Sequence, residues 1–251
     1  MGVILVRRIA LIAFVLPLLF VSCGDVDITI DVDGDDVEGS GTLTTENRTV
    51  ADFDQITLAG EGSVVVTNGP TSLSIRTDDN LLQHIETTVD GGTLRIATES
   101  GIDIDPTDSV VYEVSTPTLA GVTLSGAGSF DIGDWVVQTF SITLSGAGDI
   151  DFDSVAATSV DVTISGVGDI NVAGQTDDLE VTISGAGSFD GADLQGANVA
   201  ATTSGVGSAT VWATQTLDAK VGGVGSIDYF GNPTVTESVT GLGSINSRGA
   251  K

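Results

Sequence analysis

The chain has 251 residues, one cysteine and a formal net charge of −27. Such a negative field repels DNA, RNA and anionic membrane surfaces, which excludes nucleic acid binding, and a single cysteine excludes an intramolecular disulfide. The length suits one large β domain, and the acidic charge serves either the solubility of a displayed protein or the binding of cations.

The amino-terminal segment has the pattern of a bacterial signal peptide. Two arginines precede an apolar stretch at residues 9–20, which is shorter than the ~20 residues that span a bilayer but suits a signal core of about 7–15 residues. Ser22 and Cys23 then resemble a lipobox, in which the cysteine is acylated. We predict a lipoprotein signal peptide at residues 1–22 and an exported protein that acylated Cys23 anchors in the cell envelope, at the outer membrane. Ordinary cleavage and a retained anchor are the alternatives.

An acidic segment follows this cysteine. Residues 23–42 are predicted to form a solvated tether between the lipid and a head domain at residues 43–251. The aspartates within this segment do not match the EF-hand calcium loop, because Gly34 does not fall at the sixth position that such a loop requires.

The first part of the head domain, residues 43–116, is less regular than the rest. Gly60-Glu61-Gly62 is a degenerate copy of a motif that recurs later, and the next copy begins 66 residues further on, the length of about three longer coils. Alternation of apolar and polar residues predicts short strands near residues 72–76, 85–89 and 93–97. Asp90-Gly91-Gly92 indicates a hairpin or tight turn, and residues 103–108 indicate an exposed loop.

Residues 117–251 contain seven copies of a Gly-x-Gly motif, each followed by a small polar residue and an apolar one. The copies begin 18–20 residues apart, which is too regular to be chance. Their glycines are Gly126, Gly128, Gly146, Gly148, Gly166, Gly168, Gly185, Gly187, Gly205, Gly207, Gly223, Gly225, Gly241 and Gly243.

Strictly alternating apolar residues flank each motif, as in Val122 and Leu124 or Ile150 and Phe152. This period of two predicts strands on both sides of a glycine corner. A unit of this size cannot bury its own apolar face, so the units must stack, with each strand paired to its equivalent in the next unit. We predict an all-β fold, a parallel β-helix with coils of about 18–22 residues, in which the glycines form a ladder at a tight corner.

Three other interpretations of the glycine motif fit less well. A phosphate-binding loop would precede a helix and would not occur seven times. The calcium-binding β-roll has a period of nine, and the left-handed helix of acyltransferases has a six-residue sub-period that is absent from this sequence.

The segments VADFDQITLAGEGSVVVTNG, DDNLLQHIETTVDGGTLRI and YFGNPTVTESVTGLGSIN resemble the bacterial auto-transporter adhesin head domain, the GIN family. The resemblance covers residues 48–247. It implies a right-handed parallel β-helix and a role in adhesion, and it brings no catalytic residues with it.

Candidate ligand groups lie beside the glycine motifs. Like charges on adjacent coils repel unless a cation or water lies between them, so we predict weak Ca²⁺ sites at Asp149, Asp151, Asp169 and Asn171. No other cofactor is expected. Stacked aspartates such as Asp131 and Asp151 also approach the spacing of a glycosidase pair, but any stacked repeat with aspartate produces such pairs.

The remaining candidate residues carry little chemistry. His84 is the sole histidine and is predicted to have a packing or surface role, so no Ser-His-Asp triad can be assembled. Trp135, Trp212 and Tyr229 either fill the solenoid or form stacking platforms for sugars.

These features favour a non-catalytic, lipid-anchored adhesion or binding module with a glycan or protein ligand at the cell surface. A structural envelope protein without a ligand is the alternative, followed by a polysaccharide lyase or hydrolase, which the small number of basic residues disfavours. Uncapped solenoid ends present unpaired strand edges, which favours a homo-oligomer.

Overall fold

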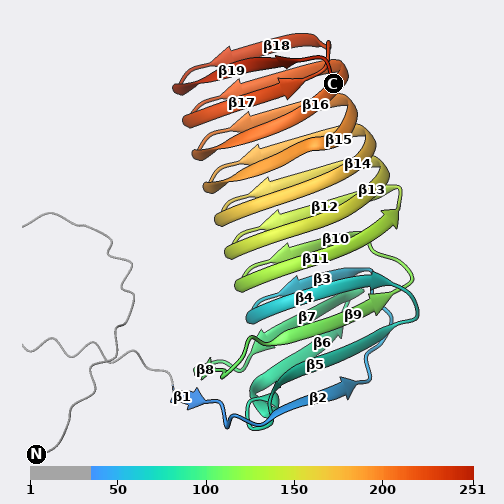
Figure 1. Cartoon of the computed structure of the whole chain (residues 1–251), viewed down its shortest axis with the longest axis vertical. Helices are drawn as coiled ribbons and strands as arrows, with labels where there is room; N and C mark the ends of the chain where they lie inside the picture. The colour runs from blue at the N-terminus through green and yellow to red at the C-terminus, as the bar shows by residue number, and fades with distance from the viewer. Residues whose placement is uncertain (1–34) are drawn as a thin grey trace, which may run out of the picture. The chain divides into compact units, whose positions relative to one another are not determined.

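The computed structural model describes residues 35–251, and these fold into one all-β unit (Figure 1). The predicted signal peptide, Cys23 and the first part of the predicted tether lie outside the described residues. Within the described range there is no helix of the length and apolarity needed to cross a membrane.

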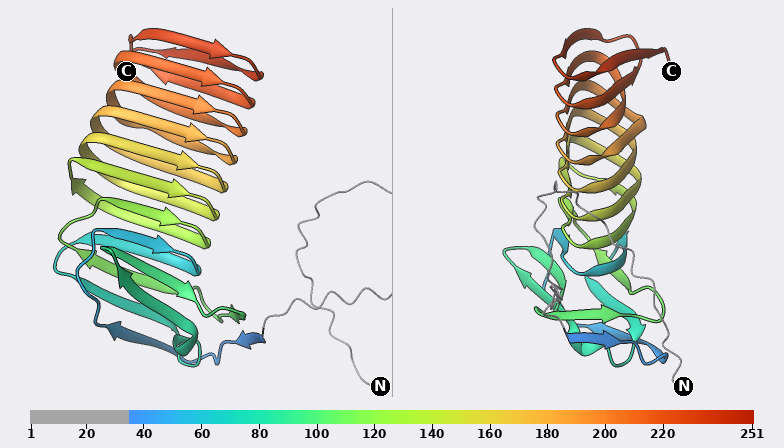
Figure 2. Two further views of the ribbon diagram at one scale, coloured as in Figure 1. Left: turned by 180° about the vertical axis from the view of Figure 1, so that it is seen from behind. Right: turned by 90° about the vertical axis from the view of Figure 1, so that its left-hand side faces the viewer.

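Two faces of parallel strands make up the solenoid. The first face contains β3 (Gln55–Leu58), β10 (Gly121–Leu124), β12 (Thr139–Leu144), the second halves of β13 (Ala147–Ile164), β14 (Val167–Ile183), β15 (Ala186–Thr203) and β16 (Val206–Val221), and β18 (Thr234–Val239). The second face contains β4 (Glu61–Asn68), β11 (Ala127–Val136), the first halves of β13 to β16, β17 (Val224–Phe230) and β19 (Leu242–Gly249). Each strand pairs with its equivalent one coil away, which confirms the predicted parallel β-helix (Figure 2).

The core lies between the two faces. Alternate residues of every strand point inward, so Leu124, Leu144 and Ile164 stack at one register position and are all fully buried. Phe140 and Phe152 meet edge to face with ring centroids 4.9 Å apart. Because each coil contributes only a few apolar side chains, stability depends on stacking between neighbouring coils.

The 66-residue interval between the first two Gly-x-Gly copies is not three coils, so that expectation was wrong. β3 and β4 pair directly with β10 and β11, and the chain between them forms a cap. The cap contains β5 (Ser72–Asp78), the 3₁₀ turn η1 (Leu82–His84), β6 (Ile85–Asp90), β7 (Thr93–Thr98) and β9 (Val111–Thr116), together with β2 (Leu43–Arg48).

Antiparallel pairing distinguishes this cap from the coils. β7 and β9 extend the two faces as parallel strands, but β6 pairs antiparallel with β7, and β5 pairs antiparallel with both β9 and β2. The predicted hairpin at residues 90–92 is the β6–β7 turn, where Gly91 and Gly92 have φ of 55° and 83°. Antiparallel pairs, of which only β6–β7 is a local hairpin, therefore replace the coil-to-coil register at the outer end of the cap.

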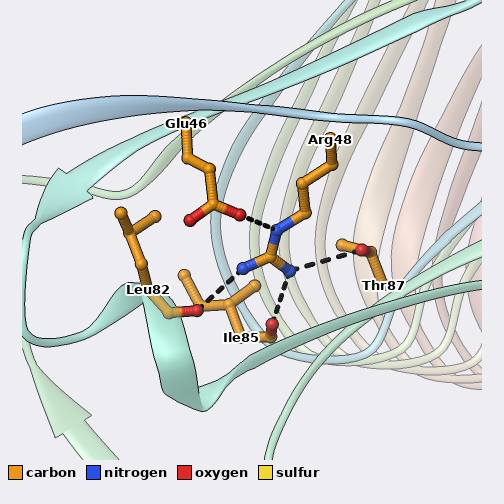
Figure 3. A network of polar contacts seen from close by, with 5 residues as sticks. All are labelled: Glu46, Arg48, Leu82, Ile85 and Thr87. Carbon is orange, nitrogen blue, oxygen red and sulfur yellow. Dashed lines mark hydrogen bonds and ion pairs between the residues drawn. The ribbon is translucent and has the colours of Figure 1, made fainter.

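Arg48, the last residue of β2, connects this strand to η1 and β6 within the cap (Figure 3). Its guanidinium donates to the carbonyl oxygens of Leu82 at 2.7 Å and Ile85 at 2.5 Å, and to Glu46 at 2.8 Å. Arg48 Nη1 also donates a hydrogen bond to the Thr87 hydroxyl at 3.3 Å. The side chain is 17% exposed, so this cation has a structural role at the end of β2.

The described end of the predicted tether lies against the cap. β1 (Asp35–Glu38) pairs in parallel with β8 (Ile102–Asp105), so residues 102–105 are a strand, although the sequence indicated a loop there. The buried Asp78 carboxylate accepts hydrogen bonds from the amides of Gly41 at 2.7 Å and Thr107 at 2.9 Å. Burial raises the pKa of Asp78, but the hydrogen bonds from Thr107 and Gly41 outweigh it, and the pKa lies below its ordinary value.

Candidate binding faces of the solenoid

The Gly-x-Gly motifs form one corner, between the first and second faces. In all seven copies a Cβ on either glycine would lie 1.7–2.1 Å from the carbonyl oxygen of the equivalent glycine in the preceding coil. The fourteen glycines thus lie in two stacked rows, where coils approach too closely for any side chain. The residue between them points outward, and Val167, Val206 and Leu242 are 60%, 62% and 78% exposed.

The second face carries two columns of outward polar side chains. One column runs through Ser129, Asp149, Asp169 and Ser188, and the other through Asp131, Asp151, Asn171 and Asp190. All four residues predicted as calcium ligands lie on this face. They come from two neighbouring strands, β13 and β14, because a coil spacing of 20 residues places them in register.

Hydrogen bonds between coils already occupy some of these carboxylates. Asp149 Oδ1 accepts from the Asp169 amide at 3.1 Å, and Asp151 Oδ1 accepts from the Asn171 side-chain amide at 2.7 Å. The Asp169 carboxylate in turn accepts from the amide and hydroxyl of Ser188. Asparagine and serine thus provide donors between acidic residues, which relieves the repulsion that the sequence suggested a cation would relieve.

The described residues contain no group of three or more histidine, cysteine, aspartate or glutamate side chains placed to hold a metal ion. Asp149, Asp151 and Asp169 therefore do not form a three-carboxylate metal site. The calcium site therefore stays a prediction.

A shallow groove of about 380 Å³ crosses the edge of the second face at β13 to β15. Four carboxylates line it together with Asn171, namely Asp151, Asp153, Asp190 and Asp193. We call it the acidic groove. Its charge favours cationic or neutral ligands and disfavours acidic polysaccharides.

Four basic residues of the described range are held in ion pairs. Besides Arg48, ion pairs hold Arg76 to Asp108 at 3.2 Å, Lys220 to Asp218 at 2.6 Å and Arg248 to Asp228 at 2.8 Å. A lyase needs unpaired cations near the substrate carboxylate, and these four are engaged.

The single histidine lies in the cap. His84 belongs to η1, and its Nδ1 lies 2.9 Å from Glu99 Oε2 at the end of the β6–β7 hairpin. This contact supports the hairpin and involves no candidate nucleophile.

The three aromatic candidates divide into two groups. Trp135 is 3% exposed and fills the solenoid, so it is no sugar platform. Trp212 and Tyr229 are half-buried. Sequence spacing alone did not separate them, because whether an aromatic residue points inward depends on register shifts such as those in the β15–β16 pairing.

Glu61, in the first copy of the motif, is partly buried beside the cap, and its Oε1 is buried without a hydrogen-bond partner. Burial, with smaller contributions from Asp103 and Asp105, raises the pKa of its carboxyl. The backbone carbonyl of Glu61 accepts a 3.1 Å hydrogen bond from the Tyr112 hydroxyl, and burial of that phenol raises the pKa of Tyr112.

Stacked parallel strands, a glycine corner and extended polar outward faces define a parallel β-helix. The chain belongs to the family described as "Putative auto-transporter adhesin, head GIN domain", whose model matches residues 52–233. This match confirms the resemblance found in the sequence.

Solved structures share the fold. The chain is similar to a "putative adhesin" from Bacteroides fragilis, with 28% identity and a TM-score of 0.81 over 84% of this chain and 99% of that one. A "putative lipid binding protein" from Parabacteroides distasonis has 24% identity and a TM-score of 0.68, again over 84% of this chain and 99% of that one. A "putative adhesin" from Parabacteroides merdae has 21% identity and a TM-score of 0.66, over 85% and 99%. No curated protein matches the chain.

Proposed function

We propose that the protein is a non-catalytic adhesion module of the cell envelope, which binds its ligand on the second face of the solenoid. The acidic groove carries this proposal, because it is a hollow on the second face that gathers two carboxylates from β13 and two from β15, with Asn171 of β14 between them. The family description and the similar structure from Bacteroides fragilis, described as a "putative adhesin", support the same role.

The chemistry of the faces argues against catalysis as the main function. The carboxylates of the second face accept hydrogen bonds within the solenoid, and four basic side chains are bound to acidic partners. A repetitive surface of this kind suits recognition of an extended ligand.

An array of glycans and envelope components tests the proposal. We expect the chain to bind a neutral or cationic component, and we expect Asp151→Asn with Asp153→Asn to weaken that binding. The matched control is Asp161→Asn with Glu180→Gln, which removes the same charge from the outside of the first face. Equal loss in both variants would mean that net charge, rather than the groove, determines binding. Absence of binding to every component would favour a structural envelope protein.

Anchoring through acylated Cys23 belongs to the same proposal and is supported by the signal-peptide pattern before it. Metabolic labelling with a fatty-acid analogue should mark the wild-type chain and leave Cys23→Ala unlabelled. Self-association also stays a prediction, which light scattering on the purified chain will check.

A further inference from the structure

Lys251 extends back across the side of the solenoid. The chain turns at Gly249, where φ is +88°, and the Lys251 ammonium then meets residues of three successive coils. It donates to the Ala192 carbonyl oxygen at 2.5 Å and is paired with the Asp193 carboxylate, both in β15. It also lies 5.2 Å from the ring centroid of Trp212 in β16 and 5.4 Å from that of Phe230 in β17.

Register places the two rings together. Trp212 pairs with Phe230 across neighbouring strands, so both rings project from one column. The equivalent positions in the three preceding coils are Ala156, Gln175 and Gln195. Gly249 follows at the same position in β19. The fold therefore accepts small or polar residues in this column, and the aromatic residues in β16 and β17 are not required for packing.

These groups match the needs of an ammonium ion. Aromatic faces attract a cation within about 6 Å of the ring centroid, and a lysine ammonium has three donors to distribute. Here one donor has a carbonyl, another has a carboxylate, and the rest of the charge lies over two rings. Asp193 also lines the acidic groove, so the site is continuous with a surface that attracts cations.

We propose that Trp212, Phe230, Asp193 and the Ala192 carbonyl form a binding site for a lysine side chain of a partner protein, and that Lys251 occupies this site in the free protein. The chain's own lysine acts as an internal competitor that the partner's lysine displaces. The site does not rest on the proposed adhesion function, because a small amine probe can test it without any cell-surface ligand.

Occupation of the site by Lys251 determines how much the Lys251→Ala variant should gain in affinity for an amine. A flexibly tethered group has an effective concentration in the millimolar range. If the site binds an ammonium group with a Kd of about 1 mM and the tethered Lys251 has an effective concentration of about 10 mM, the apparent affinity for an added amine falls roughly tenfold. Lys251→Ala should therefore lower the apparent Kd of an amine about tenfold. Lys220→Ala is the matched control, because Lys220 is exposed and pairs with Asp218 outside the site.

Titration of the full chain with Nα-acetyl-lysine amide, followed by tryptophan fluorescence, is the measurement. Trp212 is the half-buried reporter, whereas Trp135 is 3% exposed. We expect tighter binding by Lys251→Ala, unchanged binding by Lys220→Ala, and no response to the uncharged Nε-acetylated probe. In the Lys251→Ala background, Asp193→Asn and Phe230→Gln should each weaken binding about tenfold or more. The glutamine copies the residue that two earlier coils carry in this column, and circular dichroism will show that each variant is folded.

Two results would overturn the assignment. Equal affinity of Lys251→Ala and wild type, or no fluorescence response in either, would mean that there is no ammonium site for Lys251 to occupy. Cadaverine binding more tightly than a lysine-containing peptide would assign the site to free amines and not to a partner protein.

Discussion

The glycine ladder permits a sharp test at Gly146, where alanine would add a single methyl group. Its Cβ would lie 1.9 Å from the Gly126 carbonyl oxygen and 2.7 Å from the Ser125 carbonyl carbon, whereas real Cβ atoms stay at least about 3.0 Å from such atoms. The obstruction is backbone, so it cannot rotate away. Two coils must separate locally by more than about 1 Å.

This separation breaks hydrogen bonds between the coils. The amides of Gly146 and Ala147 donate to Leu124 and Gly126 at 3.0 and 2.9 Å. Overpacking costs about 1–3 kcal/mol and each lost bond about 0.5–1.5 kcal/mol, so Gly146→Ala should lower the free energy of unfolding by about 2–6 kcal/mol. For a chain of this size that is a fall in Tm of about 5–20 °C.

Thermal unfolding followed by circular dichroism measures this, with Gly133→Ala as the control. A Cβ at Gly133, also on the second face, would meet nothing closer than the Val66 carbonyl oxygen at 3.7 Å. That variant should change stability by less than about 1 kcal/mol. If the two alanine variants melt at the same temperature, steric exclusion between coils is not the reason for the glycine rows.

Four further predictions concern stability. Arg48→Met removes the charged donor that the buried carbonyls of Leu82 and Ile85 share, although Leu82 keeps its bond from the Ile85 amide, so it should cost about 2–4 kcal/mol in urea unfolding, whereas exposed Arg95→Met should cost little. Asp78→Asn should destabilise at neutral pH. Because the folded pKa of Asp78 is lowered, the difference from wild type should shrink as pH falls below about 4, and a constant difference would contradict the assignment. Glu61 has a raised folded pKa, so its ionisation destabilises the fold at neutral pH; Glu61→Gln should raise Tm there and match wild type near pH 4. The predicted calcium site should have a Kd of about 1 mM, in which case 10 mM Ca²⁺ adds about 1.4 kcal/mol; unchanged melting with calcium or chelator would remove it.

The sequence predicted the regular coils because their causes are local and repeat. A period of two specifies the strands, and a spacing of 18–20 residues aligns Ile142 with Val162 without knowledge of any other contact. The glycine rows follow from the same spacing. Asp151 and Asn171 were also expected on adjacent coils, and in the structure the Asn171 Nδ2 donates to Asp151 Oδ1 at 2.7 Å.

The cap could not be predicted in this way, because its contacts join residues far apart in the chain and do not repeat. Arg48 reaches Leu82 and Ile85, and Asp78 fixes Gly41 and Thr107. The hairpin at Gly91-Gly92 was predictable from turn chemistry, but its antiparallel partners were not. The 66 residues between Gly60 and Gly126 are long enough for either three coils or a cap, and the periodicity of the sequence did not distinguish these two structures.

The solenoid separates the residues that hold the fold from those free to serve a ligand. Inward positions and the two glycine rows have a fixed chemistry, since a change there meets another coil at van der Waals distance or closer. Outward positions have no such limit, so departures from the repeat at outward positions carry more information than the repeat itself. The change from Gln175 and Gln195 to Trp212 and Phe230 is such a departure. It adds two half-buried rings beside Asp193, and the ammonium of Lys251 lies over both. In a fold whose core and corner repeat from coil to coil, this departure is the reason that we infer an ammonium site at the aromatic column, next to the acidic groove that Asp193 also lines.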